Sequence, residues 1–265
     1  MTDRGPQDLP HGRRGLGTFQ WTRETEGLLR WRDRCNLIGQ AGLYGLAVLP
    51  WEVRRALGIR RHRLAQIDAD ALTPPDSTIA RQAEELIANA AGDMVVNHSH
   101  RTYAFGAAIA AHERLSFDPE LTYVASLLHD LYWERPAEPA HPHCFTLPAA
   151  ETAIELARDA GWEASRQTAL ADAITLHLNV WPPRGSPESY VVFIGARLDV
   201  LGYRHWDLDP ETLSIVLERH PRLDLKRQAA HGFDAQATAN PGSRVHFHTR
   251  YLASKWFTRH APFAE

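Results

Sequence analysis

The sequence has very few of the residues on which disulfide frameworks and membrane spans depend. It contains only two cysteines among 265 residues, Cys35 and Cys144, which excludes a disulfide-rich scaffold and a zinc ribbon. No apolar run approaches the roughly 20 residues that a membrane-spanning helix needs. The N-terminus is polar and rich in arginine and glycine, without the apolar core of a signal peptide. These absences predict a cytoplasmic protein with no membrane partner.

An excess of positive charge is also absent. The formal net charge is −3 at pH 7, whereas a protein that binds nucleic acid needs a basic domain or stripe. Lysines are few in the helical part, where Lys226 and Lys255 lie late in the chain. We therefore expect no nucleic-acid partner. The scarcity of lysine also argues mildly against a polyphosphate ligand, which needs converging basic side chains.

Alternation of apolar and polar residues, the pattern of a half-buried strand, is missing as well, so we expect an all-α fold. Apolar residues recur at helical spacing from Ile79 to Ala90, after Asp76 or Ser77 as the N-cap. Asp118 and Pro119 are typical of an N-cap and a first helical residue. Further helices are expected over 95–109, 121–130, 149–160, 163–177 and 244–257. Another is expected to start at Ser186, run through Asp199 and end at Gly202.

The glycine and proline content divides the chain into an arm and a domain. Residues 1–71 predict an N-terminal arm, partly disordered, with one or two short helices that pack on the core. Residues 72–265 predict one helical domain. The proline-rich segment 133–148 predicts a loop, and it holds His141 and His143, which are potential ligands.

Histidine, in contrast, is abundant, with 15 residues. The adjacent pair His129-Asp130 falls at the end of an apolar helix, among leucines. Two polar groups in such surroundings are costly to bury unless a metal or a partner satisfies them. Zn, Fe and Mn accept mixed nitrogen and oxygen ligands of this kind. The alternative interpretation is a hydrogen-bonded pair at a helix end.

Two other positions could complete a metal site. His98 and His100 lie two residues apart on a helix and point to nearly opposite sides, so both cannot bind one ion. Asp199 shares a helix face with small and apolar residues, so its carboxylate needs a metal or a partner. The alternative for Asp199 is a salt bridge to an arginine such as Arg101 or Arg197.

Four motifs taken together resemble the HD-domain superfamily of metal-dependent hydrolases, in its cyanamide-hydratase-like branch. They are NHSHRTY at 97–103, FDPEL at 117–121, LLHDL at 127–131 and GARLDVLG at 195–202. The resemblance implies an HD-domain helical bundle with an N-terminal extension. It also implies that His98, His129, Asp130 and Asp199 bind one divalent metal, either Zn, Fe or Mn.

The same resemblance implies a catalytic site. Asp130 and His177 would act on a water molecule, with His177 moving the proton. The substrate would be a small C–N electrophile such as cyanamide, a nitrile, an amide or a related heterocycle. Tyr132 and Trp133 replace the glycine that many family members carry soon after the HD pair, and we expect them to narrow the pocket.

Other functions stay open at this point. A phosphohydrolase acting on a nucleotide or phosphate ester is the main alternative, with Arg101 as a phosphate contact. A diiron oxygenase would need further ligands, for which His141, His143 and His177 are available. A metal-binding protein without turnover is the remaining hypothesis. The chain could also form a homo-oligomer, which the sequence does not determine.

Overall fold

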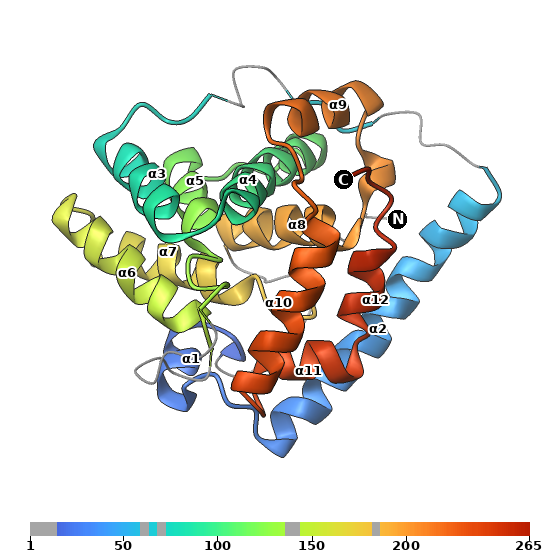
Figure 1. The fold of residues 1–265 in the computed structure, drawn as a ribbon, viewed down its shortest axis with the longest axis horizontal. Coiled ribbons are helices and arrows are strands. Elements are labelled where there is room, and N and C mark those ends of the chain that lie inside the picture. Colours follow the sequence, from blue (N-terminus) through green and yellow to red (C-terminus); the bar gives the residue numbers. More distant parts are fainter. Residues whose placement is uncertain (1–14, 59–63, 68–72, 136–143, 182–185) are drawn as a thin grey trace, which may run out of the picture.

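The fold is built from helices alone within residues 15–58, 64–67, 73–135, 144–181 and 186–265, which the computed structural model describes (Figure 1). Only two isolated β-bridges occur in these ranges. The α-helices are α1 (Phe19–Thr25), α2 (Trp31–Ala56), α3 (Thr78–Ala90), α4 (Asp93–Glu113), α5 (Pro119–Leu128), α6 (Thr146–Asp159), α7 (Ala164–Leu176), α8 (Pro187–Leu201), α9 (Pro210–Arg219), α10 (Leu225–Ala239), α11 (Arg244–Tyr251) and α12 (Ser254–Arg259), with a short 3-10 helix η3 (His205–Asp207). The expected all-α fold is confirmed.

The capping residues set the ends of the helices that carry the site. Asp118 caps α5 by accepting a hydrogen bond from the backbone N–H of Leu121, and Pro119 follows it at the first helical position. The side chain of Ser186 caps α8 in the same way. Gly202 ends α8 in the left-handed conformation, at a φ of 70° that glycine adopts without strain. These ends lie where the sequence predicted them.

Two predicted boundaries are wrong. Helix α6 begins at Thr146, inside the expected loop, because Pro148 lies in the first turn, where its missing N–H costs no hydrogen bond. The single helix expected over 244–257 is interrupted by Ala253, whose φ of 53° ends one helix before the next begins. Helix α9 was not predicted, although Asp209 and Pro210 repeat the cap pattern of α5.

The N-terminal segment is more helical than expected. Helix α2 has 26 residues, and it runs along one side of the molecule in Figure 1. Large apolar side chains on it stay exposed, among them Trp31, Ile38 and Leu46. Helix α1 packs on α6 and α7. Residues 1–14, where disorder was expected, lie outside the described ranges, and the division at residue 71 stays a prediction.

The close approach of α4 and α8 is the feature that positions the site. At Gly106, an added Cβ would meet the carbonyl oxygen of Val191 at 2.4 Å. At Gly195, it would meet the carbonyl oxygen of Thr102 at 1.9 Å. Only glycine allows two helix backbones to touch in this way. The contact places His98 of α4 beside Asp199 of α8.

Within the described ranges, no helix combines the length and the apolar character that a bilayer crossing requires. The predicted cytoplasmic location and the oligomeric state stay predictions.

Candidate metal centre

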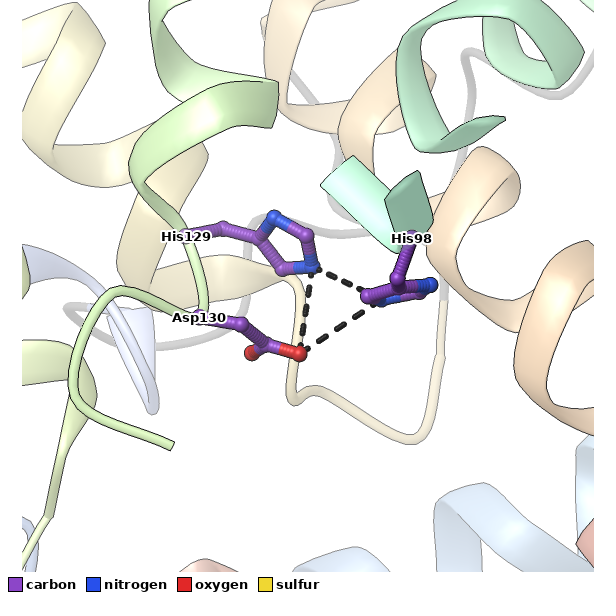
Figure 2. A group of neighbouring side chains, drawn as sticks. All are labelled: His98, His129 and Asp130. Carbon is purple, nitrogen blue, oxygen red and sulfur yellow. Dashed lines mark hydrogen bonds and ion pairs between the residues drawn. The ribbon is translucent and has the colours of Figure 1, made fainter. Parts of the chain in front are cut away.

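Three side chains from two helices converge in the interior of the molecule. His129 is the residue at which α5 ends, Asp130 follows it in a turn, and His98 projects from α4. Figure 2 shows the three side chains pointing toward one another. His98 Nε2 lies 3.2 Å from His129 Nε2, and Asp130 Oδ2 lies 3.5 Å from each of these nitrogens. In the described part of the chain, they form the one group of at least three side chains that could hold a metal ion.

Hydrogen bonds at the other ring nitrogen fix the tautomers of both histidines. His129 Nδ1 lies 2.7 Å from the carbonyl oxygen of Ser126, which can only accept, so Nδ1 carries the hydrogen. His98 Nδ1 lies 2.7 Å from Asp199 Oδ2 and donates to that carboxylate. Each Nε2 therefore turns a lone pair into the site. Two such nitrogens 3.2 Å apart need a cation between them, either a shared proton or a metal ion.

The donor spacing fits a first-row divalent metal. Ligand atoms at about 2.0–2.2 Å from a tetrahedral zinc lie about 3.3–3.6 Å apart, and the three separations here are 3.2, 3.5 and 3.5 Å. The other carboxylate oxygen, Asp130 Oδ1, is buried and has no hydrogen-bond partner among the described residues. A buried carboxylate oxygen without a donor is a costly arrangement that a bound cation would relieve.

The charges of the site depend on one another. Burial lowers the pKa of His98, but the hydrogen bonds and charges of Asp130 and Asp199 outweigh it and leave the pKa raised. Burial lowers the pKa of His129. Burial alone would raise the pKa of Asp130, yet the three histidines around it, led by His129, hold that pKa well below its ordinary range. The carboxylate is therefore ionised, as a metal ligand must be.

Asp199 is adjacent to this group but lies behind His98. Its carboxylate is fully buried and accepts hydrogen bonds from Arg101 Nε and Nη2, from Arg222 Nη1 and from His98 Nδ1, at 2.7 to 2.9 Å. Its oxygens are not among the ligand atoms that converge. The arrangement is a carboxylate–histidine pair, which orients a metal-binding imidazole. The role of Asp199 as a direct ligand stays a prediction.

His177 ends α7 and completes one wall of the site. Its Nε2 lies 3.4 Å from Asp130 Oδ1, and its ring stands edge-on to that of His129, with centroids 4.7 Å apart. Nδ1 donates to the carbonyl oxygen of Ile174, which leaves Nε2 without a hydrogen. Burial lowers the pKa of His177 to about 3, so the ring is neutral at pH 7. Its predicted catalytic role stays a prediction, now with a carboxylate neighbour identified.

A mostly apolar pocket is lined by the three converging side chains and by His177. Its empty volume is about 710 Å³, including the mouth that is open to solvent. Trp133 lines it as expected, whereas Tyr132 does not; its hydroxyl lies 3.2 Å from that of Thr152. The polar residues of the wall, apart from those already described, are Arg197, His248 and Ser254.

Several side chains differ in role from the sequence-based expectation. Arg101 is fully buried on Asp199 and on two backbone carbonyls, so it has no free face for a phosphate. His100 stacks on His220 and points away from the group, which leaves His98 as the histidine of α4 in the site. Arg222 was missed, because nothing in its local sequence marks a contact with Asp199. His141 and His143 lie outside the described residues.

Comparison with known proteins agrees with this geometry. The family model described as HD domain matches residues 95–203, a range that contains the three converging side chains, His177 and Asp199. The cyanamide hydratases DDI2 and DDI3 of Saccharomyces cerevisiae are each 26% identical over 189 residues, which cover 68% of this chain and 80% of theirs. Residues 95–203 thus match an HD domain, and the chain is distantly similar to cyanamide hydratases.

Proposed function

We propose that the protein is a metal-dependent hydratase or hydrolase that adds water to a small C–N electrophile, such as cyanamide, a nitrile, an amide or a related heterocycle. The observation that carries the proposal is the triangle of His98 Nε2, His129 Nε2 and Asp130 Oδ2, with sides of 3.2 to 3.5 Å. It lines a mostly apolar pocket, and pockets of this kind are the usual binding sites for small molecules. The distant similarity to two cyanamide hydratases supports the substrate class.

The proposed metal ligands are His98, His129 and Asp130, with one Zn, Fe or Mn ion per chain. When bound, such an ion supplies Lewis acidity that polarises the substrate and acidifies a water molecule. Neighbouring groups of the protein fix the orientation of the two imidazole rings before an ion binds. Asp199 fixes the His98 ring through Nδ1, and the carbonyl of Ser126 fixes the His129 ring in the same way.

Proton movement is the task we assign to His177. Its neutral Nε2 faces the centre of the site beside Asp130, so it can accept a proton from water and return it to the substrate nitrogen. For a nitrile or cyanamide, the water oxygen bonds to carbon, both protons pass to nitrogen, and an amide or a urea results. For an amide, the C–N bond breaks, and a carboxylic acid and an amine result.

The phosphohydrolase alternative has less support from the contacts. Arg101 is occupied by Asp199, Lys226 donates to the carbonyl oxygen of Phe263, and Lys255 pairs with Asp234. Neither lysine lines the pocket. A polyphosphate bound there would meet too few cationic donors. We also favour one ion over a diiron centre, because the described residues contain a single group of side chains that could hold a metal ion.

The test is a metal analysis combined with a substrate screen on the full chain. We expect about one Zn, Fe or Mn ion per chain in protein purified without chelator, and turnover of at least one of cyanamide, small nitriles and amides. Asp130→Ala should lose both metal and turnover while its circular dichroism stays helical. Asp234→Ala, which removes an exposed carboxylate that does not line the pocket, is the matched control and should lose neither.

Two results would overturn the proposal. One is folded, active protein that contains no metal. The other is efficient hydrolysis of nucleotides without turnover of any C–N compound, which would make the protein a phosphohydrolase. Asp199→Asn separates the two roles of that residue, because loss of an orienting partner weakens metal binding by roughly 10–100-fold. Loss of a direct ligand would weaken binding further.

A further inference from the structure

The wall of the pocket contains a cationic side chain that no carboxylate of the described residues neutralises. Arg197 lies on α8, two residues before Asp199, and it lines the same pocket as the metal-binding group. Nη2 of its guanidinium donates a hydrogen bond to the carbonyl oxygen of Asn179 at 2.6 Å, and the side chain of Tyr44, an uncharged phenol, lies close enough to interact with the guanidinium. Its Nε is buried and has no hydrogen-bond partner within the described ranges.

The other arginines whose side chains are fully or largely buried in the described part of the chain show that this is unusual. Arg101 and Arg222 pair with Asp199, and Arg204 pairs with Glu113 and Asp207. Arg244 has no carboxylate, but it is fully buried outside the pocket and bonds to several carbonyl, hydroxyl and thiol groups.

Arg197 is thus the one of these arginines that is both unneutralised and open to the pocket. Keeping a partly desolvated guanidinium without a counter-ion destabilises the folded protein by roughly several kcal/mol. A bound anion would offset that cost.

The immediate surroundings of Arg197 suit an anion on a small, partly apolar molecule. The aromatic rings of Phe193 and Tyr44 flank the guanidinium, with centroids 4.6 and 5.8 Å from its central carbon. His248 and Ser254 line the pocket close by and add two polar groups. Burial and the positive charge of Arg197 lower the pKa of His248 to about 3, so His248 is neutral at pH 7 and adds no second positive charge beside Arg197.

We infer that Arg197 binds a carboxylate of the substrate, so that the substrate class is a small nitrile, amide or related compound with an acidic group at its other end. A carboxylate matches the forked donors of a single guanidinium, whereas a phosphate would need further cations that the pocket wall does not supply. Asn179 follows His177 by two residues, so the guanidinium is held on the His177 side of the pocket. The inference rests on the proposed function for the reacting end of the substrate.

The probes for the test are cyanoacetate and cyanoacetamide, two nitriles of similar size that differ in charge. We expect calorimetry on the wild-type protein to give at least about tenfold tighter binding of cyanoacetate, the value of one charged hydrogen-bonded pair. The preference should persist after chelation, since a metal ion would itself attract a carboxylate. In Arg197→Met, the affinity for cyanoacetate should fall about tenfold or more, while that for cyanoacetamide changes little.

Two further variants make the result specific. Arg197→Lys keeps the charge but loses the fork, so it should retain part of the preference. Arg250→Met removes an exposed arginine of α11 and should retain all of it. Equal affinity of the two nitriles for the wild-type protein would overturn the inference, even if Arg197→Met failed to fold. An Arg197-dependent preference without any turnover would support the anion site and count only against the proposed function.

Discussion

At the scale of single residues, His177 is the side chain whose role the contacts narrow most. We expect His177→Ala to keep most of its metal and to lose about 100-fold or more in turnover, as for a lost acid–base group. The reason is that its Nε2 faces Asp130 Oδ1 but lies outside the three converging ligands. Metal analysis and initial rates on the same preparation measure both effects.

The control for this variant is His260→Ala, which removes an exposed histidine of the C-terminal region. It should match the wild-type protein in metal content and rate. A His177→Ala protein with half of the wild-type metal would show that His177 is a ligand and that the site holds two ions.

The residues of the site could be predicted from the sequence better than their partners. The resemblance of four motifs to the HD-domain superfamily implied His98, His129 and Asp130 as ligands, and the structure brings their ligand atoms together. The surroundings of Asp199 could not be derived, because Arg222 approaches from a segment 23 residues later, and no local pattern encodes such a contact. The charge of Arg197 was visible in the sequence, but its isolation from carboxylates was not.

At the scale of helices, the glycine contact between α4 and α8 is the feature most sensitive to change. We expect Gly195→Ala to destabilise the fold by about 1–3 kcal/mol, the usual cost of overpacking. An added Cβ would lie 1.9 Å from a backbone oxygen of Thr102, which cannot rotate away as a side chain could. The variant should also bind metal more weakly, because α8 carries Asp199. Urea unfolding and metal titration measure these effects.

Gly42→Ala is the matched substitution, because Gly42 lies within α2 and nothing would contact its added Cβ within 4 Å. There, alanine should be neutral or stabilise the protein by about 1 kcal/mol, from helix propensity alone. If Gly195→Ala were as stable as Gly42→Ala, the α4–α8 contact would not have the importance that we assign to it.

Helix ends followed from the sequence wherever a capping residue marked them, as Asp118, Ser186 and Gly202 do. The prediction of helix ends was wrong where no local residue marks the end of a helix. The break at Ala253 has neither glycine nor proline, so tertiary contacts must hold its left-handed backbone. The length of α2 was missed because scattered glycines lower helix propensity without forbidding a helix.

At the scale of the whole molecule, the metal site should contribute to stability as well as to chemistry. Without an ion, the two Nε2 atoms and a carboxylate face one another in the interior with at most a shared proton between them. We expect chelation to lower the melting temperature by about 5–10 °C, since an ion at 100 times its Kd adds about 2.7 kcal/mol. Differential scanning calorimetry with and without chelator tests this effect.

Asp130→Ala is the reference for the calorimetric experiment, because it removes one of the three ligands. Its melting temperature should respond little to chelator. An equal response in the variant and the wild-type protein would mean that the chelated ion binds elsewhere.

The dimensions of the ligand triangle also determine which ions can compete for it. Calcium and magnesium, the abundant divalent ions of cells, prefer oxygen ligands, and calcium bonds are longer, at about 2.3–2.6 Å. Two imidazoles with 3.2 Å between their nitrogens therefore disfavour both ions. Among the remaining candidates, intrinsic affinity ranks zinc above iron and manganese. Because cells do not hold these ions at equal concentrations, the ion that is available also decides which one the site takes up. We therefore expect elemental analysis of protein from zinc-rich and iron-rich media to give different metals in the same site.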